Sequence, residues 1–147
     1  MKAKLPLIFM LSIILTSCKS LTTVYPKSDF TNEKVIENIP GSTDDIYIKA
    51  NDWMVSTFAN SKSVIEFSDK ESGTILGKYF IYEALSNDKF IKIDVRIKDN
   101  SSKIKIEPFE DVIVYNYKDK AVDILKSKIE NIIADYESFM KSNSTEW

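Results

Sequence analysis

The residues best suited to chemistry lie near the start of the chain, where Leu15-Thr16-Ser17-Cys18 ends an apolar run. The run covers residues 5–15 and follows two lysines, Lys2 and Lys4. A cysteine flanked by small residues is accessible, and its thiolate is a nucleophile that can be alkylated. Because the apolar run is shorter than the ~20 residues that a membrane-spanning helix needs, it is typical of a secretory signal.

This arrangement resembles a bacterial lipobox, in which a diacylglycerol is transferred to the cysteine and the chain is cut just before it. We therefore expect residues 1–17 to be a signal peptide and Cys18 to carry palmitate-like acyl chains. Two or more such chains, at ~0.8 kcal/mol per buried methylene, anchor a protein stably to membrane lipid. The alternatives are an ordinary secretory peptide with a chance cysteine and an uncleaved anchor helix. The expected location is the bacterial cell envelope, and the sequence leaves open whether the chain is periplasmic or surface-exposed.

The remaining composition argues against several classes of function. The chain has no histidine, which removes the Ser-His-Asp type of site and the commonest metal ligand. Cys18 is the only cysteine, so no intrachain disulfide is expected. Loss of Lys2 and Lys4 with the signal peptide leaves 18 basic against 22 acidic residues. An acidic balance of this kind argues against non-specific binding to nucleic acid.

Two groups of carboxylates lie near expected turns. Solvated turn charges explain them better than a general acid/base pair or a calcium site, because the ligand spacing of such sites is missing. The sequence also has no nucleophile elbow and no phosphate-binding loop. We therefore expect no catalytic residue, metal or cofactor, and no enzymatic activity. The carboxylates concerned are Glu66, Asp69 and Glu71 in one group, and Glu107, Glu110 and Asp111 in the other.

The chain after the signal peptide is expected to form one domain on a tether. A length of 147 residues with 44% hydrophobic composition supports a single core. Residues 18–32 are expected to comprise the lipidated cysteine and a flexible tether, of which the polar residues 20–32 reach at most ~45 Å; Val24 and Tyr25 could pack on the domain instead. The domain is expected over residues 33–141, followed by a frayed tail over residues 142–147.

Two stretches have the apolar period of a helix. The first is capped by Ser42 or Thr43, after the turn signal Pro40-Gly41, and the second begins near Asp119. The second stripe could form a coiled-coil seam, but it is wide enough to favour packing inside the domain. The stripes are Ile46, Ala50, Trp53, Met54 and Phe58 in the first helix, and Val122, Leu125, Ile129, Ile132, Tyr136 and Phe139 in the second, widened by Ile124, Ile133 and Met140.

Short β-prone runs predict strands over residues 34–37, 64–67, 74–82, 90–98 and 104–107, with a further piece at 112–115. The order β-α-β-β-β-β-α predicts an α+β fold, in which a curved antiparallel sheet has its helices packed on one face. A four-residue loop over residues 99–102 predicts a hairpin that pairs Ile97 with Ile104. In that register the diagonals Arg96–Glu107 and Asp94–Lys105 are expected to make the charge contacts.

The polar face of this hairpin is the candidate surface for an envelope protein or polymer. A small-molecule or lipid carrier is the alternative, with an aromatic-lined pocket between sheet and helix; core packing also explains those aromatic residues. The candidate surface residues are Lys92, Asp94, Arg96, Lys103, Lys105 and Glu107, and the candidate pocket residues are Phe67, Tyr79, Phe80, Tyr82 and Phe90.

A family resemblance covers roughly residues 33–115. The residues that carry it are Pro40-Gly41, Tyr47, Ala50, Trp53, Phe58, Lys62-Ser63-Val64-Ile65, Asp69, Gly73 and Gly77. Their pattern resembles a family of domains of unknown function with a fold like that of the TATA-binding protein, whose members are largely envelope lipoproteins. The resemblance implies a curved antiparallel sheet backed by helices, and it brings no activity or catalytic residue. Since function depends on a site, the fold likeness alone does not imply DNA binding.

Overall fold

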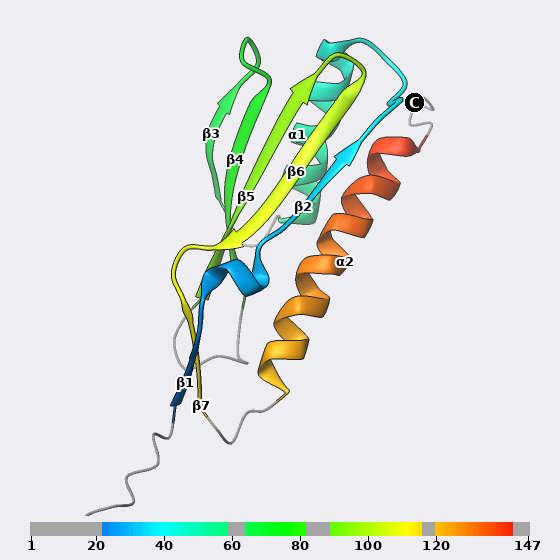
Figure 1. The fold of residues 1–147 in the computed structure, drawn as a ribbon. Helices are drawn as coiled ribbons and strands as arrows, with labels where there is room; N and C mark the ends of the chain where they lie inside the picture. The colour runs from blue at the N-terminus through cyan, green and yellow to red at the C-terminus, as the bar shows by residue number, and fades with distance from the viewer. Residues whose placement is uncertain (1–21, 59–63, 82–88, 116–119, 143–147) are drawn as a thin grey trace, which may run out of the picture.

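The computed structural model describes residues 22–58, 64–81, 89–115 and 120–142, and its elements follow one another as Figure 1 shows. Residues 1–21, which include the expected signal peptide and Cys18, and residues 143–147 lie outside this described part. The elements are β1 (Thr22–Tyr25), the 3-10 helix η1 (Lys27–Phe30), β2 (Asn32–Ile36), α1 (Thr43–Thr57), β3 (Val64–Asp69), β4 (Thr74–Ile81), β5 (Lys89–Lys98), β6 (Ser101–Pro108), β7 (Val112–Tyr115) and α2 (Ala121–Lys141).

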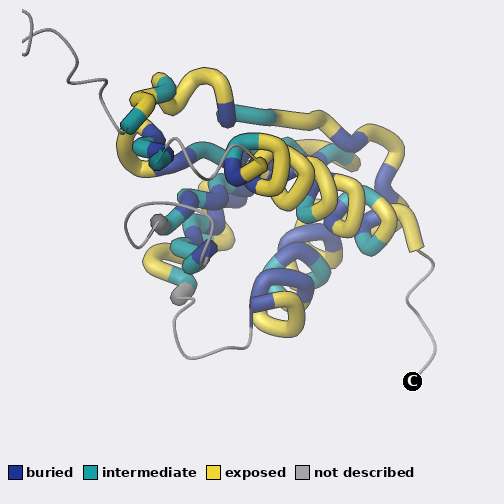
Figure 2. The backbone as a smooth tube through the Cα atoms, turned by 90° about the horizontal axis from the view of Figure 1, so that it is seen from below, coloured by how far each residue is buried: buried dark blue, intermediate teal, exposed yellow. Residues whose placement is uncertain are grey.

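The main sheet has five antiparallel strands in the order β2-β6-β5-β4-β3. Both helices pack on the same face of this sheet, as Figure 1 shows. Buried and exposed residues alternate along the strands and form stripes along the helices (Figure 2). The predicted α+β fold, with its antiparallel sheet and two helices, is therefore confirmed. Among the described residues, no helix has the length and apolar character needed to cross a bilayer.

Helix α1 begins as the sequence predicts. The Ser42 hydroxyl accepts a hydrogen bond from the Asp45 amide, and the Asp45 carboxylate accepts one from the Ser42 amide, which completes a capping box. Every residue of the predicted apolar stripe is buried against the sheet and α2. Trp53 is the centre of this packing, with 1% of its surface exposed.

Helix α2 packs into the core, as the width of its stripe predicts. The buried line runs through Leu125, Ile129, Ile133, Tyr136 and Met140. Of the outer stripe residues, Val122, Ile132 and Phe139 are partly buried against this core, whereas Ile124 is 45% exposed. The centre of the apolar face thus includes members of both the main stripe and the residues that widen it. An α-helix has 3.6 residues per turn, so a stripe that repeats every seven residues moves slowly around the helix.

Polar groups fix the two helices on the sheet. The Trp53 Nε1 group donates to the Asp135 carboxylate over 2.8 Å, which joins α1 to α2. The Tyr136 hydroxyl shares a hydrogen bond with the Ser102 hydroxyl on β6, and both side chains are buried. Burial raises the pKa of the Tyr136 phenol above its ordinary value, so this pair stays neutral. These contacts satisfy polar atoms that would otherwise destabilise the core.

The predicted register of the β5–β6 hairpin is wrong by two residues. Val95, not Ile97, pairs with Ile104, and Ile97 pairs with Ser102. The chain turns through only two residues, Asp99 and Asn100, which both have positive φ (37° and 22°). A two-residue turn of this kind matches the right-handed twist of the strands, and it outweighs the longer loop that the polar run suggests. A shift of two leaves every side chain on its predicted face.

The expected tether also differs from the structure. Residues 22–25 form β1, which pairs with β7 in a separate two-stranded ribbon, and η1 follows at once. Phe30 is 3% exposed and packs edge-on against Tyr25 with 6.2 Å between ring centroids. The polar composition of this segment therefore gives no sign of its structure. Residues 22–30 are stabilised by pairing with the distant strand β7 and by the contact between two aromatic residues. Regular structure in the described chain is thus already present over residues 22–30, before residue 33, where the domain is expected to begin.

Candidate interaction surface

The six residues of the predicted hairpin surface all lie on one face of the sheet. On β5 and β6 they alternate with core residues, and the register places Lys92 opposite Glu107, Asp94 opposite Lys105, and Arg96 opposite Lys103. Their neighbours Ile93, Val95, Ile104 and Ile106 are fully buried on the helix side. We use the term outer face for the side of the five-stranded sheet that points away from α1 and α2.

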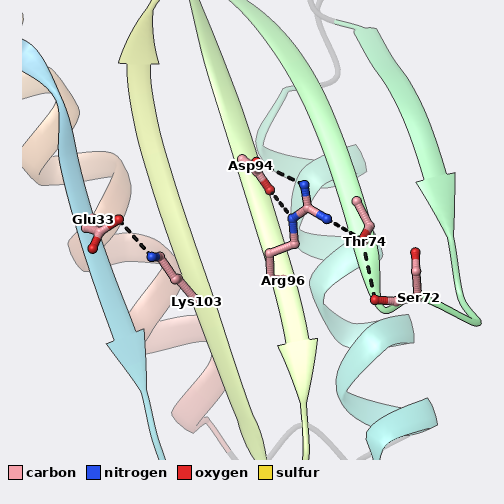
Figure 3. A network of polar contacts seen from close by, with 6 residues as sticks. All are labelled: Glu33, Ser72, Thr74, Asp94, Arg96 and Lys103. Atoms are coloured by element: carbon pink, nitrogen blue, oxygen red, sulfur yellow. Dashed lines mark hydrogen bonds and ion pairs between the residues drawn. The ribbon is translucent and has the colours of Figure 1, made fainter.

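Arg96 is the best-held cation of the outer face (Figure 3). Its Nε donates to Asp94 Oδ1 over 2.7 Å, and its Nη2 donates to Asp94 Oδ2 over 3.3 Å. The Nη1 group donates to the Thr74 hydroxyl over 2.8 Å, across to β4. The hydrogen bonds to Asp94 raise the pKa of the guanidinium above its ordinary value. A planar guanidinium held at three points is ordered before any partner arrives.

The lysines of β6 are paired as well. Lys103 Nζ lies 2.9 Å from Glu33 on β2, and Lys105 Nζ lies 2.7 Å from Glu107 on the same strand. The hydrogen bond between Lys105 and Glu107 raises the pKa of the lysine and lowers that of the carboxyl. The ion pairs that form are Arg96–Asp94 and Lys105–Glu107, each within one strand, and not the expected diagonals Arg96–Glu107 and Asp94–Lys105. The shifted register places Asp94 directly opposite Lys105 and moves Arg96 out of the diagonal position next to Glu107.

These ion pairs are exposed, so each contributes at most about 1 kcal/mol to stability. The Arg96 side chain is 54% exposed and that of Lys103 is 43% exposed. These ion pairs therefore matter more for the recognition of a partner than for the stability of the fold. The outer face presents charges of both signs in fixed positions, which suits a polar partner of matching pattern better than a uniformly charged polymer.

One end of the outer face carries aromatic rings around a lysine. Phe80 on β4 and Phe90 on β5 pair across the strands, with 5.1 Å between ring centroids. The Lys78 ammonium lies 4.1 Å from the centroid of Phe90 and 5.5 Å from that of Phe109. Phe109, which follows β6, is 44% exposed. We refer to Lys78, Phe80, Phe90 and Phe109 as the aromatic cluster.

The five residues of the predicted pocket are not gathered between sheet and helix. Tyr79 packs on Phe58, the C-cap of α1, with 4.6 Å between ring centroids, and so lies on the helix side. Phe80 and Phe90 lie on the opposite face, and Phe67 is 48% exposed beside Leu76. Tyr82 lies outside the described residues. Consecutive residues of a strand point to opposite faces, which separates Tyr79 from Phe80.

Several carboxylates of the two groups make structural contacts in the described part of the chain. Asp69 accepts a hydrogen bond from the Glu71 amide over 3.1 Å, and a hydrogen bond with the Ser72 side chain lowers the pKa of Asp69. Asp111 accepts one from the Lys27 amide over 2.9 Å, and Glu107 pairs with Lys105. Within residues 22–58, 64–81, 89–115 and 120–142, no cluster of three acidic residues is placed to hold a metal ion.

Sequence reasoning missed several residues of the outer face, namely Glu33, Thr74, Leu76, Lys78 and Phe109. Alternation along β4 does place Thr74, Leu76 and Lys78 on one face, but it does not say which strands lie beside it. Glu33 reaches Lys103 only because β2 pairs with β6, far along the chain. The strand order would have placed these residues on the outer face, but a single sequence does not contain it.

Comparison with known proteins identifies the fold. The family model described as "Domain of unknown function (DUF4468) with TBP-like fold" matches residues 30–111. A TBP-like protein from Parabacteroides distasonis ATCC 8503 is similar in structure, with a TM-score of 0.58 and 16% sequence identity over 76% of this chain and 92% of that one. A DUF4468 family protein from Bacteroides ovatus ATCC 8483 has a TM-score of 0.50 and 18% identity, over 79% and 89% of the two chains. No curated protein sequence gave a significant match.

Proposed function

This chain belongs to the DUF4468 family of domains with a TBP-like fold, and we propose that it is a lipid-anchored, non-enzymatic binding module of the bacterial cell envelope. Its outer face binds an envelope protein, or else an envelope polymer with exposed polar groups. The family is described as a domain of unknown function, so support for this role comes from the surface of the molecule. The membrane anchor in this proposal is the acylated Cys18 of the lipobox.

The observation that carries the proposal is the pattern of side chains on the outer face. Its centre presents ion pairs held in place, and its end presents the aromatic cluster with Lys78. Arginine and aromatic side chains are the residue types most enriched at the energetic centres of protein interfaces. A carrier with an internal aromatic pocket has less support, because the residues proposed for that pocket lie on both faces of the sheet.

Photo-crosslinking in the intact envelope tests the binding face. A photoreactive residue is placed at Lys92 or Lys103 on the outer face of the full-length chain, or at Lys128 on the exposed side of α2 as the matched control. We expect a discrete adduct from both outer positions, with a yield about ten-fold above that of Lys128. Phe109→Ala, at an exposed position of the aromatic cluster, should lower that yield several-fold. Equal adducts from both sides, or none from the outer face, would contradict the proposed binding face.

The lipid anchor has its own test. Cys18→Ser removes the only thiol in the chain, so the acyl chains have no point of attachment. We expect the membrane-bound fraction to fall about ten-fold or more and incorporation of labelled palmitate to disappear, because stable anchoring needs two acyl chains. Thr16→Ser, which keeps a small residue in the lipobox, is the control and should leave both readouts unchanged. Retention of the Cys18→Ser chain on membranes would show that another feature anchors it.

A further inference from the structure

The position of β1 defines which end of the domain is nearest to the lipid. Only three residues, 19–21, separate Cys18 from Thr22, where β1 begins. Fully extended, the four steps from Cys18 to Thr22 span at most about 14 Å. The tether that the composition suggests would have allowed roughly three times that distance. The domain is therefore joined to its expected anchor by a short link rather than by a long flexible tether.

The chain after Thr22 is fixed to the domain by several contacts. All four residues of β1 pair with β7, from Thr22 opposite Tyr115 to Tyr25 opposite Val112. The Lys27 amide then donates to Asp111, and the buried ring of Phe30 lies under the Lys126 ammonium, 5.7 Å from its Nζ. β1 cannot be drawn out to lengthen the link without the loss of these contacts.

The β1–β7 ribbon projects from one end of the molecule. In Figure 1 it extends beyond the five-stranded sheet on the side opposite to the β5–β6 turn, and α2 begins near the ribbon and ends at the far side. Strand β6 alone, from Ser101 to Pro108, separates the turn from the ribbon by about 23 Å at ~3.3 Å per residue. The two ends of the domain thus lie at different distances from Cys18.

We propose that the open end of the β1–β7 ribbon is a membrane-contact site that lies in the lipid headgroup layer, with the β5–β6 turn as the end far from the membrane. The inference rests on the proposed lipidation of Cys18. The headgroup layer of one leaflet is roughly 5–8 Å thick, so a link of at most about 14 Å is long enough to place the ribbon in this layer and too short to carry it far above the layer. The ribbon suits that layer, because Val24 is 58% exposed and Tyr115 pairs with Thr22 at the open end.

This orientation has a consequence for the outer face. If the ribbon is held at the lipid surface, the five strands rise from it, and the outer face is presented sideways along the membrane rather than down onto it. Charged residues such as Arg96 and Lys103 then stay in water, where a second envelope component can reach them. The lipid surface contacts the ribbon, and the binding partner contacts the sheet.

Quenching by lipid-attached nitroxide tests the orientation. The full lipidated chain is placed in vesicles of phosphatidylethanolamine and phosphatidylglycerol with a nitroxide on the headgroups. Cys18 is consumed by lipidation, so an added cysteine is the only reactive thiol; a fluorophore is attached at Val24→Cys on the ribbon or at Lys98→Cys beside the distal turn. We expect about three-fold stronger quenching at position 24, because the turn lies more than 20 Å further out.

A second variant separates the link from the anchor. Insertion of about twelve Gly and Ser residues after Lys19 adds a flexible span of about 20 Å, and it should bring quenching at position 24 down to the level at position 98 while the vesicles still float with protein. Equal quenching at both positions in the unmodified chain that floats would overturn the orientation and leave the lipid anchor intact. A chain that does not float with vesicles would overturn the proposed anchor and this inference together.

Discussion

Replacement of Gly73 by alanine is expected to lower the free energy of unfolding by about 3 kcal/mol. Gly73 has φ +62°, a left-handed conformation that costs alanine about 1–2 kcal/mol. A Cβ at this position would also meet the Ile97 carbonyl oxygen at 2.4 Å, so β4 and β5 would have to move apart. That oxygen cannot give way cheaply, because Ile97 donates its own amide to the Gly73 carbonyl over 2.8 Å. Urea denaturation of residues 19–147 measures the loss.

Asparagine at the same position separates the two causes. Asn tolerates positive φ better than other residues with a Cβ, so it should recover most of the stability if backbone conformation were the whole cost. We expect Gly73→Asn to be nearly as unstable as Gly73→Ala, since both carry the Cβ that meets Ile97. Lys70→Ala, at an exposed position of the same turn, should change stability by at most about 0.5 kcal/mol. Stability recovered by Asn would show that the close approach to Ile97 is relieved at little cost.

The parts of the fold that sequence predicted are those set by local periodicity. The stripe from Ile46 to Phe58, along α1 and its C-cap, packs against the sheet and α2, and every member of the stripe is buried. Alternation along β5 likewise gave the correct buried face, and with it the placement of Lys92, Asp94 and Arg96 on one side. Period alone determines these features, because a side chain's face depends only on its position along its own element.

The parts that sequence missed depend on contacts between distant segments. The β5–β6 turn was predicted too long, because Asp99-Asn100 lacks the glycine that usually marks a two-residue turn with positive φ. The ribbon was missed because Thr22–Tyr25 has the composition of a linker and becomes a strand only opposite Val112–Tyr115. Strand propensity is a weak guide for such a segment, since pairing supplies most of its stability.

The candidate surface was predicted in part for the same reason. The six charged residues were found from alternation, but two of their partners, Glu33 and Thr74, were not, because these come from strands that only the sheet order brings alongside. The aromatic residues were grouped as one pocket because the sequence gave their type and not their side of the sheet. Tyr79 packs against Phe58 on the helix side of the sheet, whereas Phe90 lies beside Lys78 on the outer face.

Trp53→Ala is expected to cost about 3–5 kcal/mol, the largest single effect on stability that we predict. The indole is 1% exposed and lies between Phe58 and Tyr136, with 5.3 Å and 4.6 Å between ring centroids. Alanine would leave a cavity between α1 and α2 and would remove the donor that holds Asp135. Since domains of this size are stable by about 5–15 kcal/mol, much of the protein should unfold at moderate urea concentrations. Equilibrium denaturation of residues 19–147 is the measurement.

Matched variants divide this loss between packing and the hydrogen bond. Trp53→Phe keeps a buried ring but loses the Nε1 donor, so we expect a smaller loss of about 1–2 kcal/mol. Val55→Ala, on the same helix at a position that is 56% exposed, should lie within about 0.5 kcal/mol of the unmodified chain. If Trp53→Ala cost no more than Val55→Ala, α1 and α2 would not share the core described above. A Trp53→Phe chain as unstable as Trp53→Ala would instead place most of the cost in the bond to Asp135, because the ring's volume would then contribute little.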